Sequence, residues 1–115
     1  MSKRNLRLYI EDILESIEAI ESYMTDVNNF DDFANDRKTY SATIREYIII
    51  GEAILPLLES LENKFPNYEW RMMKDFRNFI VHEYFGIDLQ IIWDITNLEL
   101  NELKTKIESL EKDLK

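Results

Sequence analysis

The sequence predicts an all-α protein built as a four- to five-helix up-and-down bundle. Only two Gly and two Pro occur among 115 residues, so turn signals are scarce and the elements must be few and long. Apolar residues make up 45% of the chain, which is enough for a packed core. They recur at the steps of three and four that are typical of helices. At this length we expect one domain over residues 1–115.

Two long helices are expected in the first half of the chain. The first covers about Lys3–Val27, because its apolar residues follow a single face. Turn and cap residues at 28–32 break the pattern, and a short turn of helix is expected before the second long helix, about Lys38–Lys64. Pro56 should kink that helix, since it removes a backbone donor. The stripe of the first helix consists of Leu6, Ile10, Ile13, Ile17, Ile20, Met24 and Val27.

Two further helices are expected in the second half. The third runs from about Tyr68 or Trp70 toward Tyr84. Asp88 suits the N-cap of a fourth helix, about Leu89–Leu114. The apolar stripe of the fourth helix consists of Leu89, Trp93, Thr96, Leu100, Leu103, Ile107, Leu110 and Leu114.

The second and fourth helices each carry a second apolar stripe. Two explanations fit: a helix buried on several sides inside one bundle, or a two-fold homodimer packed through these helices. The second stripes are Ile49, Ile50, Ala53 and Leu57 on the second helix, and Ile91, Ile95 and Leu98 on the fourth.

The net charge of −9 argues against a general nucleic-acid binder, because affinity for phosphate comes mainly from Lys and Arg. The charge is unevenly distributed. Residues 1–36 hold nine acids against three bases, whereas residues 37–93 hold eight acids against seven bases. A local basic surface on an acidic body would bind RNA weakly, with a steep dependence on salt.

Several kinds of site are excluded by residue counts. The chain has no Cys and a single His, which excludes thiolate chemistry and a two-histidine metal site within one chain. There is no glycine-rich phosphate loop and no calcium-type loop, so we expect no metal and no cofactor. The longest apolar runs fall far short of the ~18 residues of a membrane span. We expect a cytoplasmic protein that does not contact the membrane.

After these exclusions, the remaining candidates for catalytic residues are Arg77 and His82, near the end of the third helix. Arg offers a permanent, forked positive charge that matches phosphate oxygens, and His can exchange a proton near neutral pH. His82 could take the proton of a ribose 2′-OH while Arg77 stabilises the charge on the attacked phosphate. On a regular helix the two side chains would lie about 140° apart. That geometry favours a helix that ends near His82 or a cleft shared by two protomers.

Each of these residues also has a simpler structural role. A lone His at a helix end is commonly a cap or a partner of the helix dipole. Arg77 could neutralise Glu52, which adjoins an apolar stripe. Tyr84 could be an ordinary aromatic with its hydroxyl in water.

Beyond these residues, an ordered set of motifs resembles the HepT-like family of the HEPN superfamily over nearly the whole chain. The fourth helix lacks only the proline that this family commonly carries near residues 97–100. The matching segments are Leu8-Tyr9-Ile10-Glu11-Asp12-Ile13-Leu14, Ala42-Thr43-Ile44-Arg45-Glu46, Ile50-Gly51-Glu52-Ala53, Pro66, Trp70, Arg77-Asn78, His82, Tyr84, Ile87-Asp88 and Trp93.

The resemblance implies a homodimeric, metal-independent endoribonuclease with an HEPN-like helical fold. It implies that Arg77 and His82 of both protomers are catalytic at the dimer cleft, and that Asn78 supports the site. Many members of the family are toxins paired with an MntA-like nucleotidyltransferase antitoxin. By that likeness the antitoxin would adenylylate Tyr84, adding bulk and negative charge where RNA phosphate must bind.

Two alternatives remain open. The helical dimer could be a non-catalytic binding or regulatory partner of a nucleotidyltransferase, which the charge of −9 would suit. A purely structural bundle ranks last, because it leaves the matching polar motif residues unexplained.

Overall fold

The computed structural model describes residues 2–70 and 88–114, and every regular element in these two ranges is a helix. The elements are α1 (Lys3–Tyr23), the 3-10 turn η1 (Met24–Asp26), α2 (Phe30–Ala34), α3 (Arg37–Ile54), the 3-10 turn η2 (Leu55–Leu57), α4 (Leu58–Lys64), α6 (Leu89–Leu98) and α7 (Leu100–Asp113).

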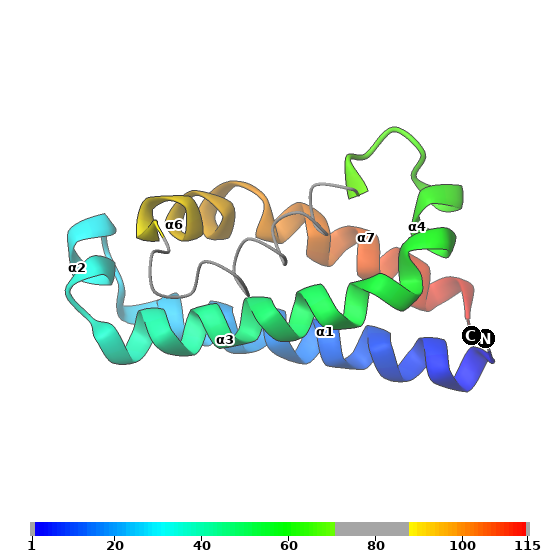
Figure 1. Ribbon diagram of the computed structural model, residues 1–115, viewed down its shortest axis with the longest axis horizontal. Coiled ribbons are helices and arrows are strands. Elements are labelled where there is room, and N and C mark those ends of the chain that lie inside the picture. Colours follow the sequence, from blue (N-terminus) through cyan, green and yellow to red (C-terminus); the bar gives the residue numbers. More distant parts are fainter. Residues whose placement is uncertain (1, 71–87, 115) are drawn as a thin grey trace.

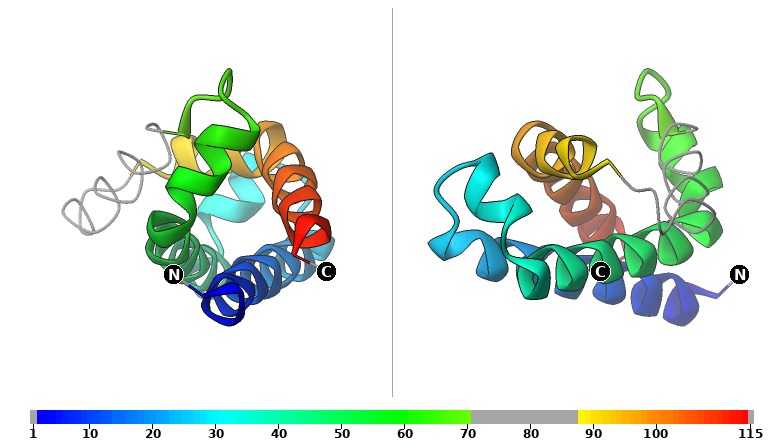
Figure 2. Two further views of the ribbon diagram at one scale, coloured as in Figure 1. Left: turned by 90° about the vertical axis from the view of Figure 1, so that its right-hand side faces the viewer. Right: turned by 60° about the vertical axis from the view of Figure 1, so that its left-hand side comes forward.

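The helices form an elongated bundle. α1 and α3 run antiparallel along its length, and α6 and α7 follow one another in a second layer, again antiparallel to α1 (Figure 1). Viewed end-on, α1, α3 and α7 surround a common centre (Figure 2). α2 closes one end and α4 rises at the other. The predicted all-α bundle is confirmed.

The helices begin where short polar side chains can accept from free backbone N–H groups. The Ser2 hydroxyl accepts from the N–H of Asn5 (3.2 Å) at the start of α1. Asp36 does the same for Thr39 (3.1 Å) at the start of α3 and also accepts from the Thr39 hydroxyl (2.6 Å). These two bonds from Thr39 lower the pKa of Asp36. Asn29 accepts from the N–H of residue 32 (2.9 Å) at the start of α2.

The apolar stripe of α1 forms the floor of the core, as its spacing predicts. Four of its side chains are fully buried, and the outer members at residues 6, 24 and 27 pack partly exposed against them. α1 ends four residues earlier than expected, because the chain tightens into η1 before it turns toward α2. The fully buried members are Ile10, Ile13, Ile17 and Ile20.

Pro56 divides the predicted second helix, as expected. The backbone changes from α3 to the 3-10 turn η2 at Leu55 and resumes as α4 at Leu58. A proline cannot donate to the carbonyl four residues before it, and its ring crowds that turn. The resulting bend lets α4 leave the axis of α3 (Figure 1).

The predicted fourth helix is also divided, at Glu99, and this break was not expected. Two side chains just before it bond to backbone carbonyls of the preceding turn. The Thr96 hydroxyl donates to the Ile92 carbonyl and the Asn97 amide donates to the Trp93 carbonyl, each at 2.8 Å. Such bonds compete with the backbone ladder and bend helices. The bend therefore needs no proline.

A buried hydrogen bond joins α3 to α6. The hydroxyl oxygens of Tyr47 and Thr96 lie 2.6 Å apart. Either hydroxyl can be the donor in this pair, and the Thr96 hydroxyl also lies within hydrogen-bond distance of the Ile92 carbonyl. Burial raises the pKa of the Tyr47 hydroxyl well above its ordinary value, which keeps it protonated. The bond fixes the register of α6 over α3.

The second apolar stripes of the predicted second and fourth helices differ in how far they are buried. Ile50 and Ala53 of α3 and Leu57 of η2 are buried in the core of the same chain, which supports burial on several sides. On α6, Ile91 and Leu98 remain exposed. Of the predicted third helix, Trp70 is helical, and the residues that follow it lie outside the described part of the chain.

We expect Tyr47→Phe to lower the free energy of unfolding by about 1 kcal/mol, because a buried hydrogen bond between α3 and α6 is lost. Chemical denaturation of purified protein measures this change. Tyr9→Phe is the matched control, since Tyr9 is a half-buried tyrosine of α1 whose hydroxyl has no hydrogen bond within the described residues. Equal losses in the two variants would contradict the role assigned to the Tyr47 hydroxyl.

Ile17→Ala should cost roughly 2–5 kcal/mol, because it opens a cavity in the middle of the α1 stripe. Leu8→Ala on the outer face of α1 should change stability by less than about 0.5 kcal/mol. Both changes in the free energy of unfolding are obtained from the denaturant midpoints, with the dependence of that free energy on denaturant concentration unchanged between variants. A small loss for Ile17→Ala would mean that α1 is not the floor of the core.

Candidate functional site

Four of the five predicted site residues lie outside the described residues. Arg77, Asn78, His82 and Tyr84 belong to the segment 71–87, so their predicted roles are neither supported nor contradicted by geometry. The structure describes instead how the chain is held where it enters and leaves this segment.

Trp70 anchors the chain on the near side of the segment. Its side chain is 2% exposed, and its indole N–H donates to the carbonyl of Phe65 (3.0 Å). Its ring lies 4.5 Å from that of Tyr68, measured between centroids. The ammonium group of Lys106, on α7, lies over both Phe65 (5.2 Å) and Tyr68 (4.8 Å), and such cation–π contacts are favourable. The loop is therefore tied to α7 directly before the motif segment.

Asp88 anchors the chain on the far side. Its carboxylate accepts from the N–H of Gln90 (2.9 Å) and caps α6, as the sequence predicts. One turn of helix further on, Ile92 is fully buried, and Thr96 is bonded to Tyr47 of α3. Both ends of the motif segment are thus fixed to the same core, which is the arrangement that precise positioning of reactive groups requires.

Glu52 is exposed on α3 between the buried residues Gly51 and Ala53. Whether Arg77 pairs with it lies outside the described residues.

The buried carboxylate of α3 belongs instead to Glu46, which sequence reasoning missed. It is 9% exposed and accepts a hydrogen bond from the hydroxyl of Tyr23 on α1 (2.8 Å). This bond, followed by burial and the charge of Glu46, raises the pKa of Tyr23. The available signal was position, since Glu46 falls between Thr43 and Ile50 on the core-facing side of the helix.

Three of the described lysines are paired with acidic side chains. Lys64, Lys104 and Lys106 form ion pairs with Asp113, Glu21 (2.9 Å) and Glu102 (3.1 Å), respectively.

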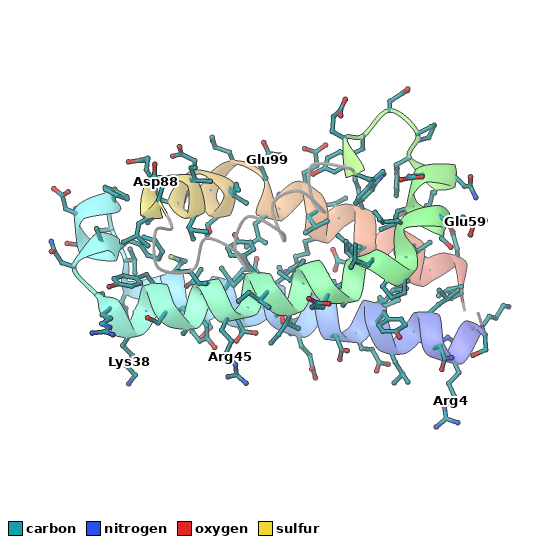
Figure 3. All side chains as sticks on the ribbon, in the orientation of Figure 1. Arg4, Lys38, Arg45, Glu59, Asp88 and Glu99 are labelled. Atoms are coloured by element: carbon teal, nitrogen blue, oxygen red, sulfur yellow. The ribbon has the colours of Figure 1, made fainter. Side chains whose placement is uncertain are left out.

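Arg37, Lys38 and Arg45 of α3, by contrast, are exposed and form no ion pair within the described part of the chain. Lys38 and Arg45 point from the same side of α3 away from the bundle (Figure 3). The spacing of seven residues puts them about 10 Å apart along the helix. These side chains are available to bind an anion.

Residues 2–70 and 88–114 lack two further kinds of feature. They contain no group of three His, Cys, Asp or Glu residues that could hold a metal ion. No helix within them has the length and apolar character needed to cross a membrane.

Comparison with known proteins places the chain in a family. The family described as "Ribonuclease HepT-like" matches residues 13–110. A Methanocaldococcus jannaschii protein, provisionally named an RNase, is 41% identical over 115 residues, covering 99% of this chain and 93% of the relative. A Thermococcus cleftensis protein named as a probable ribonuclease HepT is 38% identical over 110 residues, covering 96% and 99%. No solved structure matches the chain at a significant level. The chain belongs to the HepT-like ribonuclease family of the HEPN superfamily, as its ordered motifs predicted.

Proposed function

We propose that this protein is a metal-independent endoribonuclease toxin of a toxin–antitoxin pair. The observation that carries the proposal is the family match over residues 13–110 together with Arg77 and His82 at the motif spacing. Membership of this family makes the protein a ribonuclease that acts on RNA. The residues that cut, the independence from metal and the biological role are our inference. We place its action in the cytoplasm, where its substrate is found.

In the proposed reaction the RNA supplies its own nucleophile. His82 removes the proton from a ribose 2′-OH, and the oxygen attacks the adjacent phosphorus. The bond from phosphorus to the 5′-oxygen breaks, leaving a 2′,3′-cyclic phosphate, and the departing 5′-oxygen takes a proton from water and becomes a hydroxyl. Arg77 stabilises the extra negative charge on the phosphate oxygens, and Asn78 supports the site. DNA, which lacks the 2′-OH, would remain intact.

We further propose that two copies of the chain form a homodimer with a shared cleft. Arg77 and His82 are five residues apart, which puts them on different sides of a regular helix. Two motif segments brought together across a two-fold axis would supply an Arg from one protomer near the His of its partner. Within each protomer, residues 1–115 would form a single HEPN-like domain, which the shared core of α1, α3 and α7 supports.

We also propose that the ribonuclease activity is regulated by modification of Tyr84. An MntA-like nucleotidyltransferase encoded alongside the protein would attach AMP to its hydroxyl, two residues from His82. The added phosphate would repel RNA from the site and the added nucleoside would occupy it.

The alternative is a non-catalytic partner that only docks or regulates a nucleotidyltransferase. The net charge of −9 favours it, because such a charge weakens RNA binding and does not hinder protein binding. Under this alternative, substitution of His82 would leave the physiology of the pair unchanged.

Arg77→Ala and His82→Ala should each reduce RNA cleavage by at least about 100-fold, because each removes a group that acts in the transition state. The measurement is the cleavage rate of purified protein on RNA in the presence of EDTA. Lys112→Ala, at the exposed end of α7, should retain full activity. Equal activity of His82→Ala and the unsubstituted protein would contradict the assignment, as would a requirement for added metal.

The double variant Lys38→Ala with Arg45→Ala should weaken RNA binding and flatten its salt dependence. The slope of log affinity against log salt should fall by roughly 1.4, at about 0.7 for each lost phosphate contact with a single strand. Fluorescence anisotropy on the inactive His82→Ala background measures binding without cleavage. Arg4→Ala with Lys112→Ala removes the same charge from the opposite end of the molecule and serves as control. Identical slopes for the two double variants would show that α3 does not contact the RNA.

A further inference from the structure

The outer face of α6 carries a stripe of apolar side chains that the fold leaves uncovered. Ile91 is 39% exposed, Leu98 is 74% exposed, and Ile95 between them is half-buried. Their spacing of four and three residues places them on one face of the helix over two turns, about 10 Å long. Only one other large apolar side chain in the described ranges is exposed, Leu8 of α1, and it stands alone.

The packing of α6 onto the core uses only Ile95 from this stripe, and the exposed Ile91 and Leu98 take no part in it among the described residues. The opposite side of the helix makes that contact through the fully buried Ile92, with Leu89 and Trp93 packed beside it. Trp93 also meets the ring of Phe33 on α2, with 5.6 Å between centroids. α6 is therefore anchored on one side and presents a second apolar side outward. Contiguous exposed apolar stripes of this kind mark interaction surfaces.

Acidic side chains surround the stripe. Asp94 flanks it on one side, Asp88 and Glu99 flank it on the other, and Glu102 lies beyond its far end. All four are exposed, and no Lys or Arg occurs in the sequence from residue 88 to residue 103. Asp88 and Glu99 project outward along the α6 side of the molecule in Figure 3. The surface thus combines an apolar centre with a rim of one sign of charge.

We propose that this face, the α6 stripe, docks an amphipathic helix of a protein partner, with apolar residues along its centre and Lys or Arg on its flanks. Anchors at i, i+4 and i+7 are the pattern by which one helix face meets another. The partner's cations would lie opposite Asp94 and Glu99, where charge complementarity sets orientation and speeds association. The proposal goes beyond the ribonuclease activity and does not depend on it.

The negative charge around the α6 stripe favours a basic amphipathic helix over a second copy of the chain, RNA or a membrane surface. A second copy paired face to face across a two-fold axis would bring the acidic rim against its own duplicate, which is unfavourable. RNA phosphates would be repelled by the same four carboxylates. An anionic membrane surface attracts basic segments, not acidic ones. A basic, amphipathic helix satisfies both the apolar centre and the rim.

The test uses the full chain and two synthetic helical peptides of about 18 residues, roughly 27 Å long. Both have the same leucine stripe, and one carries Lys on its polar face whereas the other carries Glu. Calorimetry should show binding of the Leu–Lys peptide and not of the Leu–Glu peptide. Ile91→Ser with Leu98→Ser, and separately Asp94→Asn with Glu99→Gln, should each weaken that binding by at least about tenfold. Amide resonances that shift on titration should map to α6.

Leu8→Ser with Glu11→Gln and Glu15→Gln is the matched control, because it removes an exposed leucine and nearby acids from α1. It should leave binding of the Leu–Lys peptide within about twofold of the unsubstituted protein. Equal weakening by the control would show that the peptide only senses net charge and would overturn the proposal.

Two other results would also overturn the proposal. A smaller oligomer formed by Ile91→Ser with Leu98→Ser would assign the stripe to a second copy of the chain. A marked fall in Tm of the same variant would show that the chain covers the stripe itself. RNA cleavage by these variants should equal that of the unsubstituted protein. Peptide binding therefore tests the docking proposal, and RNA cleavage tests the ribonuclease assignment separately.

Discussion

The packing of α1 against α3 is the constraint on which the other elements depend. The four fully buried isoleucines of α1 commit one whole face of that helix to the core, and this face sets where α3 and α7 can lie. Long antiparallel helices packed in this way leave little freedom to their connections. The bend at Pro56 and the capped start of α3 at Asp36 then fix where the chain leaves the bundle.

The core built on the packing of α1 against α3 also matters for the proposed catalysis, because the two ends of the motif segment are attached to it. In the reaction that we propose, an imidazole and a guanidinium act on a phosphate without the help of a bound cation, so positioning would carry more of the rate enhancement. In this chain the motif segment starts from Trp70, which is buried against Phe65, and returns at Asp88, which caps α6. Trp70 is buried in the core, and α6, which Asp88 caps, packs on the same core through Ile92.

Apolar periodicity predicted the helices because burial dominates their stability, and Pro56 predicted the bend of the second helix because its effect is local. The break at Glu99 escaped prediction, since it arises from hydrogen bonds of Thr96 and Asn97 to their own helix. Glu46 was overlooked because its charge suggested an exterior residue, whereas Tyr23 satisfies it inside. The motif could be read from residue type and order. Its mutual geometry could not, because spacing along one helix does not specify where a second copy lies.

The charge distribution reconciles an acidic protein with an RNA substrate. Three of the six described lysines, Lys64, Lys104 and Lys106, are neutralised by neighbouring acids. Lys38 and Arg45 on α3 form no ion pair within the described residues and point outward together. Exposed acids are numerous on the outer face of α1 and around the stripe of α6, and Asp31, Asp32 and Asp36 also lie near the start of α3. Because exposed charges are screened within about 8–10 Å at physiological salt, distant acids oppose RNA only weakly at α3. Those same acids favour a basic protein at α6. One small bundle can therefore present chemically opposite surfaces to two kinds of partner, and net charge alone predicts neither.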